Sequence, residues 1–398
     1  MLKKVLSTVL AVAMLAAVCL IFASCGNKTS DFKIGIICLH DETSTYDLNF
    51  LNAIEGAQKA LGLTDDQVVI IKNVPESSAC FDAAKDLVDQ GCKVIFADSF
   101  GHESFMIQAA KAYPEVMFCH ATGTKAHTEK LPNYFNAFAS IYEGRYLAGV
   151  AAGLKLNELK EAGKLKGDVP KMGYVGAYPY AEVKSGYTSF FLGARSICPS
   201  VTMEVTFTSS WYDEALEKEA ANKLINNGCV LISQHADSMG APTACETAGV
   251  PNVSYNGSTV AACPNTFIVS SRIDWTPFFV YAINCVASGE DIGYDWTGTL
   301  ATGSVVLTEV NEAAAAAGTV EKIAEVMKAL EDGSVKVFDT ATFTVNGETV
   351  STYLADVDDL GDYVGETEAI SDGAFLESFY RSAPYFDLDI DGITNLDA

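Results

Sequence analysis

The sequence predicts an α/β protein of two lobes, each built on a doubly wound parallel sheet. Length is the first observation: the 398 residues exceed what one hydrophobic core supports, even after an N-terminal export segment is set aside. Composition is the second, since 49% of residues are apolar and 19% are charged, which is typical of a globular chain. The third is a short apolar run followed by a helical stretch, repeated in two sets along the chain, which favours right-handed βαβ units.

The first set follows a short polar segment and predicts one lobe. Its β-branched or apolar runs alternate with amphipathic stretches. The predicted strands are 33–39, 68–73, 93–99, 116–122 and 134–140, and the predicted helices are 47–61, 79–89 and 103–112.

The second set begins after the polar loop 158–168 and repeats the pattern. The predicted strands are 172–178, 203–209, 229–236, 250–257 and 266–274, and the predicted helices are 182–197, 213–226, 241–248 and 275–286. A β segment at 301–310 and an Ala-rich helix at 311–330 follow. The acidic remainder has hairpin character around Asn346-Gly347.

No flexible linker separates the two sets, so we expect strands that cross between the lobes and act as a hinge. The predicted division is lobe 1 at 33–137, with 270–300 returning to it, and lobe 2 at 138–269, with 301–334. Residues 335–398 are predicted to be an acidic C-terminal extension.

Residues 1–25 resemble a bacterial lipoprotein signal peptide. Lys3 and Lys4 precede an uncharged apolar run from 5 to 22, and Ala-Ser precedes Cys25. The resemblance implies that Cys25 is diacylated and becomes the mature N-terminus, with 26–32 as a polar tether, which would place the protein outside the cytoplasmic membrane. An uncleaved anchor helix is the alternative.

The net charge of −25 argues against nucleic-acid binding and against electrostatic docking on anionic lipid, because both need a basic surface. Nine cysteines follow Cys25, without C-x-x-C spacing and in odd number. They are predicted to be structural free thiols rather than a metal site or a disulfide framework.

Catalytic motifs are scarce. His40-Asp41-Glu42 matches half of a zinc-deaminase motif, but the P-C-x-x-C half is absent, so a polar loop is the preferred interpretation. No G-x-S-x-G, H-E-x-x-H, P-loop or post-strand G-x-G-x-x-G occurs. We therefore predict no catalytic residue, metal or cofactor.

Aromatic and polar residues recur just after the predicted strands, where open parallel sheets bind ligands. Flat aromatic faces with carboxylates suit a planar heterocycle that bears N–H donors. The candidate ligand-binding residues are Tyr46, Asp47, Phe100, Tyr178, Trp211, His235, Asp237, Asp274 and Trp275.

Several stretches resemble the basic membrane protein (BMP) family, the purine-receptor type of ABC transporter substrate-binding protein. They are VIFADSFGHESFMIQAAKAYPEVMFCHATG (94–123), YEGRYLAGVAAG (142–153), MGYVGAYPYAEVKSGYTSFFLGAR (172–195), SSWYDEALEKEAANKLINNGCVLISQHAD (209–237) and IDWTPFF (273–279). The resemblance implies a type I periplasmic-binding-protein fold that closes over a purine and presents it to a permease. Three short motifs, QHAD (234–237), WYD (211–213) and DW (274–275), are closer to those of a branch of the family that is associated with a free nucleobase such as adenine.

On that resemblance, Tyr46 and Trp211 would stack on the ligand from opposite lobes, and Asp237 and Asp274 would accept hydrogen bonds. Phe100, Tyr178, His235 and Trp275 would line the cleft. Glu143 and Arg145 are expected to serve the hinge or a surface ion pair. The protein is expected to be a monomer.

Two alternatives remain open at this point. A sugar-binding or signalling receptor on the same fold would need more polar groups, to which Arg272 and Asn256 could contribute. An exported nucleoside hydrolase or deaminase would need a metal or an activated nucleophile, for which no recognisable motif is present.

Overall fold

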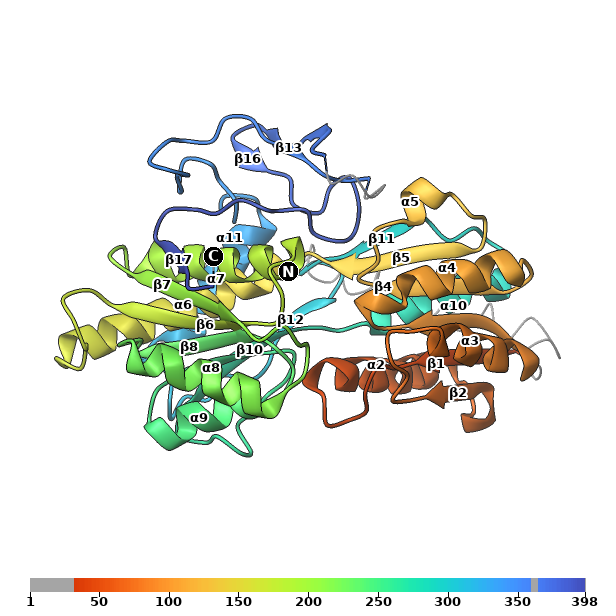
Figure 1. Ribbon diagram of the computed structural model, residues 1–398, viewed down its shortest axis with the longest axis horizontal. Coiled ribbons are helices and arrows are strands. Elements are labelled where there is room, and N and C mark those ends of the chain that lie inside the picture. The colour runs from red at the N-terminus through yellow and green to blue at the C-terminus, as the bar shows by residue number, and fades with distance from the viewer. Residues whose placement is uncertain (1–31, 359–363, 398) are drawn as a thin grey trace, which may run out of the picture.

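Two mostly parallel sheets, one in each lobe, organise the chain in the computed structural model. The structure describes residues 32–358 and 364–397. Figure 1 shows the lobes side by side along the long axis of the molecule, with the C-terminal segment above them. The predicted α/β class and two-lobed arrangement are confirmed.

The sheet of lobe 1 has six strands, all parallel. Ile34, in the strand next to one edge, pairs with Val68 on one side and Val94 on the other. The strands lie in the order β11 (Asp295–Gly298), β5 (Tyr134–Ala139), β4 (Met117–Ala121), β3 (Cys92–Ala97), β1 (Lys33–Ile37) and β2 (Val68–Ile71).

Helices cover both faces of this sheet, with a buried cluster beneath each pair. On one face lie α2 (Thr45–Leu61) and α10 (Thr276–Ser288); on the other lie α3 (Ala79–Asp89) and α4 (Glu103–Ala112). Ser44 caps α2 by accepting a hydrogen bond from the Asp47 N–H, and Gly62 ends it with φ of 66°. Short helices η1 (Asp65–Gln67), η2 (Phe100–His102) and α5 (Ala126–Glu129) join these elements.

The sheet of lobe 2 has seven strands, of which only β12 is antiparallel to its neighbour among the described residues. The order is β12 (Val305–Leu307), β10 (Phe267–Ile273), β9 (Asn252–Tyr255), β8 (Leu231–His235), β6 (Lys171–Gly176), β7 (Thr202–Phe207) and β17 (Ile393–Asn395).

The helices of lobe 2 also form two layers. One face carries α6 (Ile141–Glu161) and α7 (Ala181–Ile197), with α11 (Thr319–Glu331) packed outside α6; the other carries α8 (Glu214–Asn226) and α9 (Gly240–Ala248). Helices α6 and α7 touch at their backbones. A Cβ at Gly149 would lie 2.1 Å from the Phe190 carbonyl oxygen, which explains the glycine in the AGVAAG stretch.

The chain passes between the sheets three times, from β5 to α6, from β10 to α10 and from β11 to β12. These crossings bond to one another: the Ser140 N–H donates to the Gly298 carbonyl at 2.7 Å, and the Asp274 N–H donates to the Ser304 carbonyl at 2.7 Å. The Leu300 N–H donates to Glu143 Oε2 at 3.2 Å. Glu143 therefore contacts the hinge, as expected.

Arg145 does not form a surface ion pair, which was one of the two roles expected for it. Its side chain is fully buried in lobe 2 and donates to the hydroxyls of Tyr174 and Ser233 at 3.1 and 2.9 Å. Its guanidinium also lies 5.0 Å from the ring centre of Tyr255. Arg145 lies in the first turns of α6 after a crossing, and its side chain points into the core of lobe 2. The expected surface ion pair is therefore wrong for this residue.

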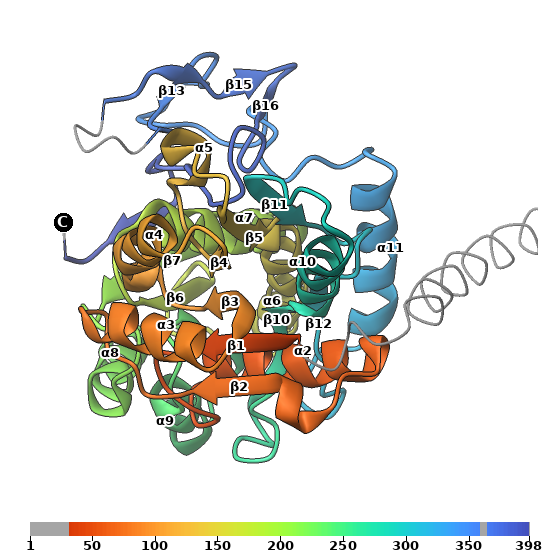
Figure 2. The same ribbon diagram turned by 90° about the vertical axis from the view of Figure 1, so that its right-hand side faces the viewer.

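The C-terminal segment, which was predicted to be an acidic extension, is part of the fold of lobe 2. Strand β17 pairs with β7, and Phe338, Phe375 and Phe386 enter the main core of lobe 2. The segment also reaches lobe 1, because the Ser382 N–H and hydroxyl donate to Asp295 Oδ1 in β11 at 3.0 and 2.8 Å. Figure 2 shows β13, β15 and β16 of this segment at the top of the molecule.

Several local predictions need adjustment. The helix expected at 311–330 begins only at Thr319, after Gly318 at φ of 78°, and the β segment at 301–310 forms only the three residues of β12. Strand β11 was not anticipated, since Asp-Trp-Thr-Gly is short and poor in β-branched residues. The predicted hairpin is confirmed: Val345 and Glu348 pair across Asn346 and Gly347, which have φ of 53° and 82°.

The remaining strands are two-residue pairs in the C-terminal segment, β13 (Leu354–Ala355) with β14 (Thr367–Glu368) and β15 (Ile370–Ser371) with β16 (Ala374–Phe375). All nine described cysteines are buried free thiols, as predicted. Within residues 32–358 and 364–397, no helix combines the length and apolarity needed to cross a membrane.

Candidate binding site between the lobes

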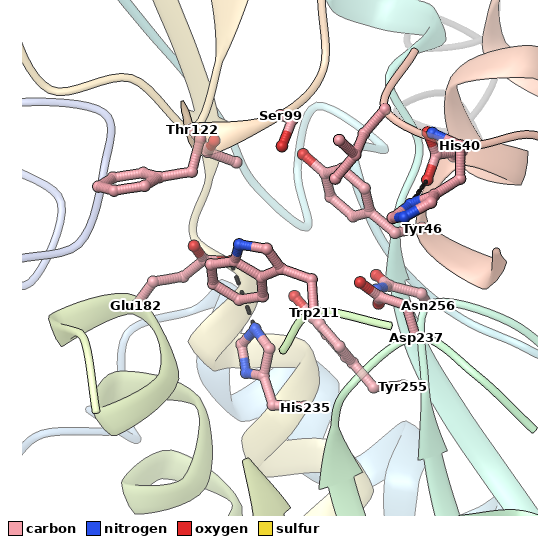
Figure 3. A pocket seen from close by; sticks show the side chains of 13 residues that line it. His40, Tyr46, Ser99, Thr122, Glu182, Trp211, His235, Asp237, Tyr255 and Asn256 are labelled. Carbon is pink, nitrogen blue, oxygen red and sulfur yellow. Dashed lines mark hydrogen bonds and ion pairs between the residues drawn. The ribbon is translucent and has the colours of Figure 1, made fainter. Parts of the chain in front are cut away.

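A pocket lies between the lobes, at the carboxyl ends of strands from both sheets; together with the solvent at its mouth it encloses about 400 Å³. Figure 3 shows side chains from both lobes pointing into it. The pocket is lined by Leu39, His40, Tyr46, Asp47, Ser99, Phe100 and Thr122 of lobe 1 and by Glu182, Trp211, His235, Asp237, Tyr255 and Asn256 of lobe 2.

Tyr46 supplies the aromatic wall from lobe 1. It lies in the first turn of α2, and its hydroxyl donates to the Asp98 carbonyl oxygen at 2.6 Å, which fixes the ring. The ring of Phe50, one turn further along α2, packs 5.2 Å away. Burial raises the pKa of Tyr46, so its hydroxyl stays protonated.

Two buried carboxyl groups lie behind this wall. Asp47 accepts from the His40 N–H at 2.8 Å, and Asp98 accepts from the Leu39 N–H at 3.0 Å. Burial, reinforced by the neighbouring Asp47 carboxylate, raises the pKa of Asp98 well above its usual value. Burial opposes ionisation of Asp47 too, but hydrogen bonds from His40, Ser44 and Asp98 outweigh it and lower its pKa. Asp98 therefore holds its proton to a higher pH than an exposed carboxyl group does, whereas Asp47 ionises more readily.

Cys38 joins these two carboxyl groups in a cluster whose ligand atoms lie within 4.8 Å of one another. Such a set has the atoms for a metal ion, but hydrogen bonds link Cys38 to Asp98 and Asp98 to Asp47. Burial also raises the pKa of the Cys38 thiol well above normal, which disfavours the thiolate that a metal requires. We interpret the cluster as proton-linked support for the pocket wall.

Trp211 supplies the aromatic wall from lobe 2, in the loop between β7 and α8. Tyr178 meets it edge-on with ring centres 5.1 Å apart, and Tyr180 stacks on Tyr178 at 5.2 Å. Tyr178 thus supports Trp211 from behind and is not among the pocket-lining residues.

Asp237 and Asn256 form the main polar pair of lobe 2. Asn256 Nδ2 donates to Asp237 Oδ1 at 2.8 Å, and both side chains are buried. Burial, reinforced by Glu217, raises the pKa of Asp237 well above its usual value. The Asp237 carboxyl group is therefore poised to hydrogen-bond to a ligand that enters the pocket.

His235 and Glu182 form a second polar pair, with His235 Nε2 3.3 Å from Glu182 Oε1. Burial lowers the pKa of His235 although Glu182 opposes this, so the imidazole is neutral at physiological pH. The imidazole packs on the Tyr255 ring at 4.4 Å, and Nδ1 has no hydrogen-bond partner among the described residues.

The lobes touch around the pocket. The Thr45 N–H and hydroxyl each donate to the Asp237 carbonyl oxygen at 3.2 Å, and Asn49 Nδ2 donates to the Asn256 carbonyl oxygen at 2.9 Å. The ring of His40 also lies 5.4 Å from that of Tyr212. These contacts describe a closed arrangement of the two lobes.

The structure brings six of the nine sequence-predicted residues into the pocket wall: Tyr46, Asp47, Phe100, Trp211, His235 and Asp237. It does not bring Asp274 and Trp275 there. Trp275 is fully buried in lobe 1, stacked on Phe50 at 4.7 Å, and Asp274 accepts from the Thr276 N–H at the start of α10. Both follow a strand at which the chain crosses to the other lobe. Trp275 enters the core of lobe 1, and Asp274 stays partly exposed beside Arg272.

Several lining residues were not predicted, although the same signal would have found most of them. Ser99 and Thr122 follow β3 and β4, and Tyr255 and Asn256 lie at the end of β9. Asn256 was predicted only as a possible sugar contact, and His40 was considered only as part of the zinc motif that was rejected. Glu182 lies in the first turn of α7 and gave no such signal.

The fold and this pocket define a bilobal ligand-binding protein, with a site completed only when the lobes meet. The family whose model matches residues 41–337 is the ABC transporter substrate-binding protein PnrA-like family, and the chain belongs to it. This confirms the resemblance found in the sequence.

Two curated relatives each match about half of this chain. A purine-binding protein of Brucella abortus is 32% identical over 223 residues, which cover 56% of this chain and 59% of that protein. A putative ABC transporter glucose-binding protein of Haloferax volcanii is 34% identical over 216 residues, which cover 54% and 51%. The chain thus matches between half and three fifths of the length of these relatives.

Solved structures share the fold. A solute-binding protein of an ABC transporter system from Conexibacter woesei superposes with a TM-score of 0.61 at 20% identity, covering 77% of this chain and 98% of that one. A similar protein from Aeropyrum pernix gives a TM-score of 0.64 at 17% identity, covering 77% and 93%. At these identities the likeness concerns the fold alone.

Proposed function

We propose that this protein is the extracytoplasmic substrate-binding component of an ABC transporter, and that it binds a purine nucleobase or nucleoside and delivers it to a permease. The observation that carries the proposal is the pocket between the lobes, in which Tyr46 and Trp211 come from opposite lobes and Asp237 adds a buried carboxyl group. Stacking on aromatic rings supplies contact area to any base, and the carboxyl group reads its N–H edge.

Binding follows from the geometry of the lobes. A ligand that touches Tyr46 in lobe 1 and Trp211 in lobe 2 gains both contacts only when the lobes are closed. It therefore shifts the population toward the closed form, which the crossing strands permit by bending at their ends. Nothing in this cycle requires bond breaking by the protein.

Titration calorimetry with adenine, guanine, adenosine and inosine tests the proposal. We expect a dissociation constant below about 1 μM for at least one purine. Trp211→Ala should weaken it by about 5- to 150-fold, since base–aromatic stacking contributes about 1–3 kcal/mol. Trp211→Phe, which keeps an aromatic face, should retain most of the affinity. Absence of purine binding by the unaltered protein would refute the proposal.

A sugar is the second candidate ligand, because a relative carries a glucose-binding name. Sugar sites also stack on tryptophan but must satisfy many hydroxyls. Of the two residues that could contribute to a sugar site, Asn256 lines the pocket, whereas Arg272 lies 3.7 Å from Asp274 and is not among the pocket-lining residues. Including D-glucose in the calorimetry separates the two candidates.

Nucleoside hydrolysis or deamination is the candidate from another class. His40 of the partial zinc motif is directed to Asp47, and Glu42 pairs with Lys72 at 2.7 Å on the surface. Incubation with adenosine should therefore return adenosine. Release of adenine or inosine would instead identify an enzyme.

We further propose that Cys25 is lipidated and holds the protein at the membrane, as its signal-like sequence suggests; residues 1–31 lie outside the described part of the chain. Cys25→Ser should release the protein from the membrane fraction while purine affinity stays unchanged. Loss of affinity in this variant would contradict a simple tether.

A further inference from the structure

Thr122 is the most unusual residue of the pocket wall. It follows β4, its side chain is 5% exposed, and its backbone φ is +67°. A β-branched residue rarely adopts this left-handed conformation, and such strain persists where the surroundings enforce it. Its hydroxyl has no hydrogen-bond partner among the described residues, although it is buried.

A buried polar network enforces this conformation. The Thr122 N–H donates to the Ala137 carbonyl oxygen at 2.9 Å, which fixes the start of the turn. Glu103 Oε1 then accepts from the N–H groups of Thr124 and Lys125 at 2.8 and 2.9 Å. The turn is therefore held at both ends.

The middle of the turn is equally constrained. A Cβ at Gly123 would lie 2.0 Å from Asn136 Nδ2, so this position accepts only glycine without rearrangement. Asn136 Oδ1 accepts from the Ala126 N–H at 2.7 Å, and Tyr134 donates to Glu103 at 3.0 Å. These contacts hold the turn in place, and Thr122 at its start lies in the pocket wall.

Several other polar side chains around the pocket already have partners, although His235 Nδ1 has none among the described residues. The Tyr46 hydroxyl donates to the Asp98 carbonyl, Asp47 accepts from His40, and Asn256 donates to Asp237. A buried hydroxyl without a partner costs free energy, and a ligand that supplies one would recover it. Figure 3 shows Thr122 and Ser99 on one side of the pocket and Asp237 and Asn256 on another, so a bound molecule can meet polar groups at two edges.

We propose that Thr122 is a ligand-contacting residue whose hydroxyl hydrogen-bonds to the edge of the ligand away from Asp237. The inference rests on the proposed function for its ligand class, because a purine carries polar atoms on more than one edge. It adds a specificity-determining residue that is positioned by Glu103, Gly123 and Asn136.

Thr122→Val is the decisive variant, because valine keeps the size and branching of threonine and removes only the hydroxyl. We expect the dissociation constant of the bound purine to rise about 10-fold. The melting temperature without ligand should stay the same or rise, since an unpartnered buried hydroxyl is gone. Thr122→Ser should keep affinity within about 3-fold, because it retains the hydroxyl.

Thr188 provides a matched control. It is fully buried in α7, its hydroxyl also has no partner among the described residues, and it is not among the pocket-lining residues. Thr188→Val should leave the melting temperature without ligand unchanged or raised and leave affinity unchanged. Binding is measured for adenine, guanine, adenosine, inosine and D-glucose.

The outcomes separate the inference from the proposed function. If the unaltered protein binds D-glucose and no purine, the proposed function fails, and a 10-fold loss of glucose affinity in Thr122→Val would still support the role of Thr122. Unchanged affinity in Thr122→Val overturns the inference. So does a parallel loss of affinity and melting temperature in both Thr122 variants, which would indicate a purely structural role. If the unaltered protein binds none of the five probes, both are overturned.

Discussion

At the residue scale, the pocket depends on carboxyl groups whose protonation is set by burial. Asp98 is fully buried beside Asp47, and its raised pKa means that the folded protein retains this proton at a pH where the unfolded chain has lost it. A raised folded-state pKa gives stability that is fully present below the unfolded pKa of about 3.9 and is lost as pH rises toward the folded pKa. The burial of Asp98 behind the pocket wall therefore makes the stability of the folded protein depend on pH.

Asp98→Asn should remove this sensitivity, because the amide can still accept from the Leu39 N–H and can donate to Asp47. Between pH 4.5 and 7.5 the free energy of unfolding of the variant should rise relative to the unaltered protein, by at most about 1.4 kcal/mol per pH unit. Urea unfolding at a series of pH values measures the difference. A difference that is constant with pH would mean that Asp98 ionises normally.

Individual residues also show how much of the pocket could be predicted from the sequence. Six of nine predicted residues line the pocket because a residue after a parallel strand lies at the carboxyl edge of the sheet. The same rule failed for Trp275, which is buried in lobe 1 at a crossing that periodicity does not reveal. Nor could sequence spacing reveal that Thr122 adopts a left-handed conformation, since that depends on contacts with Glu103 and Asn136 from other elements.

At the element scale, helix α2 joins the lobes in the closed arrangement. Its first turns present Thr45 and Asn49 to the backbone carbonyl oxygens of Asp237 and Asn256 in lobe 2. Neither side chain needs to touch the ligand to favour closure. The predicted amphipathic helix at 47–61 gave the position of α2 to within two residues, but its contacts with the other lobe depend on three-dimensional packing.

Asn49→Ala should weaken ligand binding without altering the pocket wall. Loss of one buried hydrogen bond between the lobes destabilises the closed form, so we expect about 5- to 10-fold weaker affinity, mainly through faster dissociation. Stopped-flow measurement of ligand release checks this. Asn52→Ala, at an exposed position of the same helix, serves as the control and should release ligand at the unaltered rate. Equal rates in both variants would show that the Asn49 bond has no part in closure.

At the scale of the whole molecule, the C-terminal segment is structural although its acidity predicted an extension. Phe386 is fully buried and stacks on Phe338 at 4.5 Å, while Phe379 is 71% exposed. The family match ends at residue 337, so this packing lies beyond what the family model describes. The acidic charge of the segment predicted a solvated surface. Instead, the apolar residues that lie between its acidic residues pack into the core and determine its fold.

Phe386→Ala should lower the free energy of unfolding by about 3–5 kcal/mol, the usual cost of emptying a buried aromatic site. Phe379→Ala should change it by less than about 0.5 kcal/mol. Chemical denaturation of both variants makes the comparison. Similar small effects would mean that the segment contributes little to the stability of lobe 2.

The central claim is that the two lobes close over a purine. Native mass spectrometry of the protein purified without unfolding tests it most directly, because a closed pocket retains its ligand through gentle handling. We predict a bound molecule with the mass of a purine base or nucleoside, displaced when excess adenine or guanosine competes for the site. A retained hexose, or a protein whose mass stays unshifted after purines are added, would contradict the account.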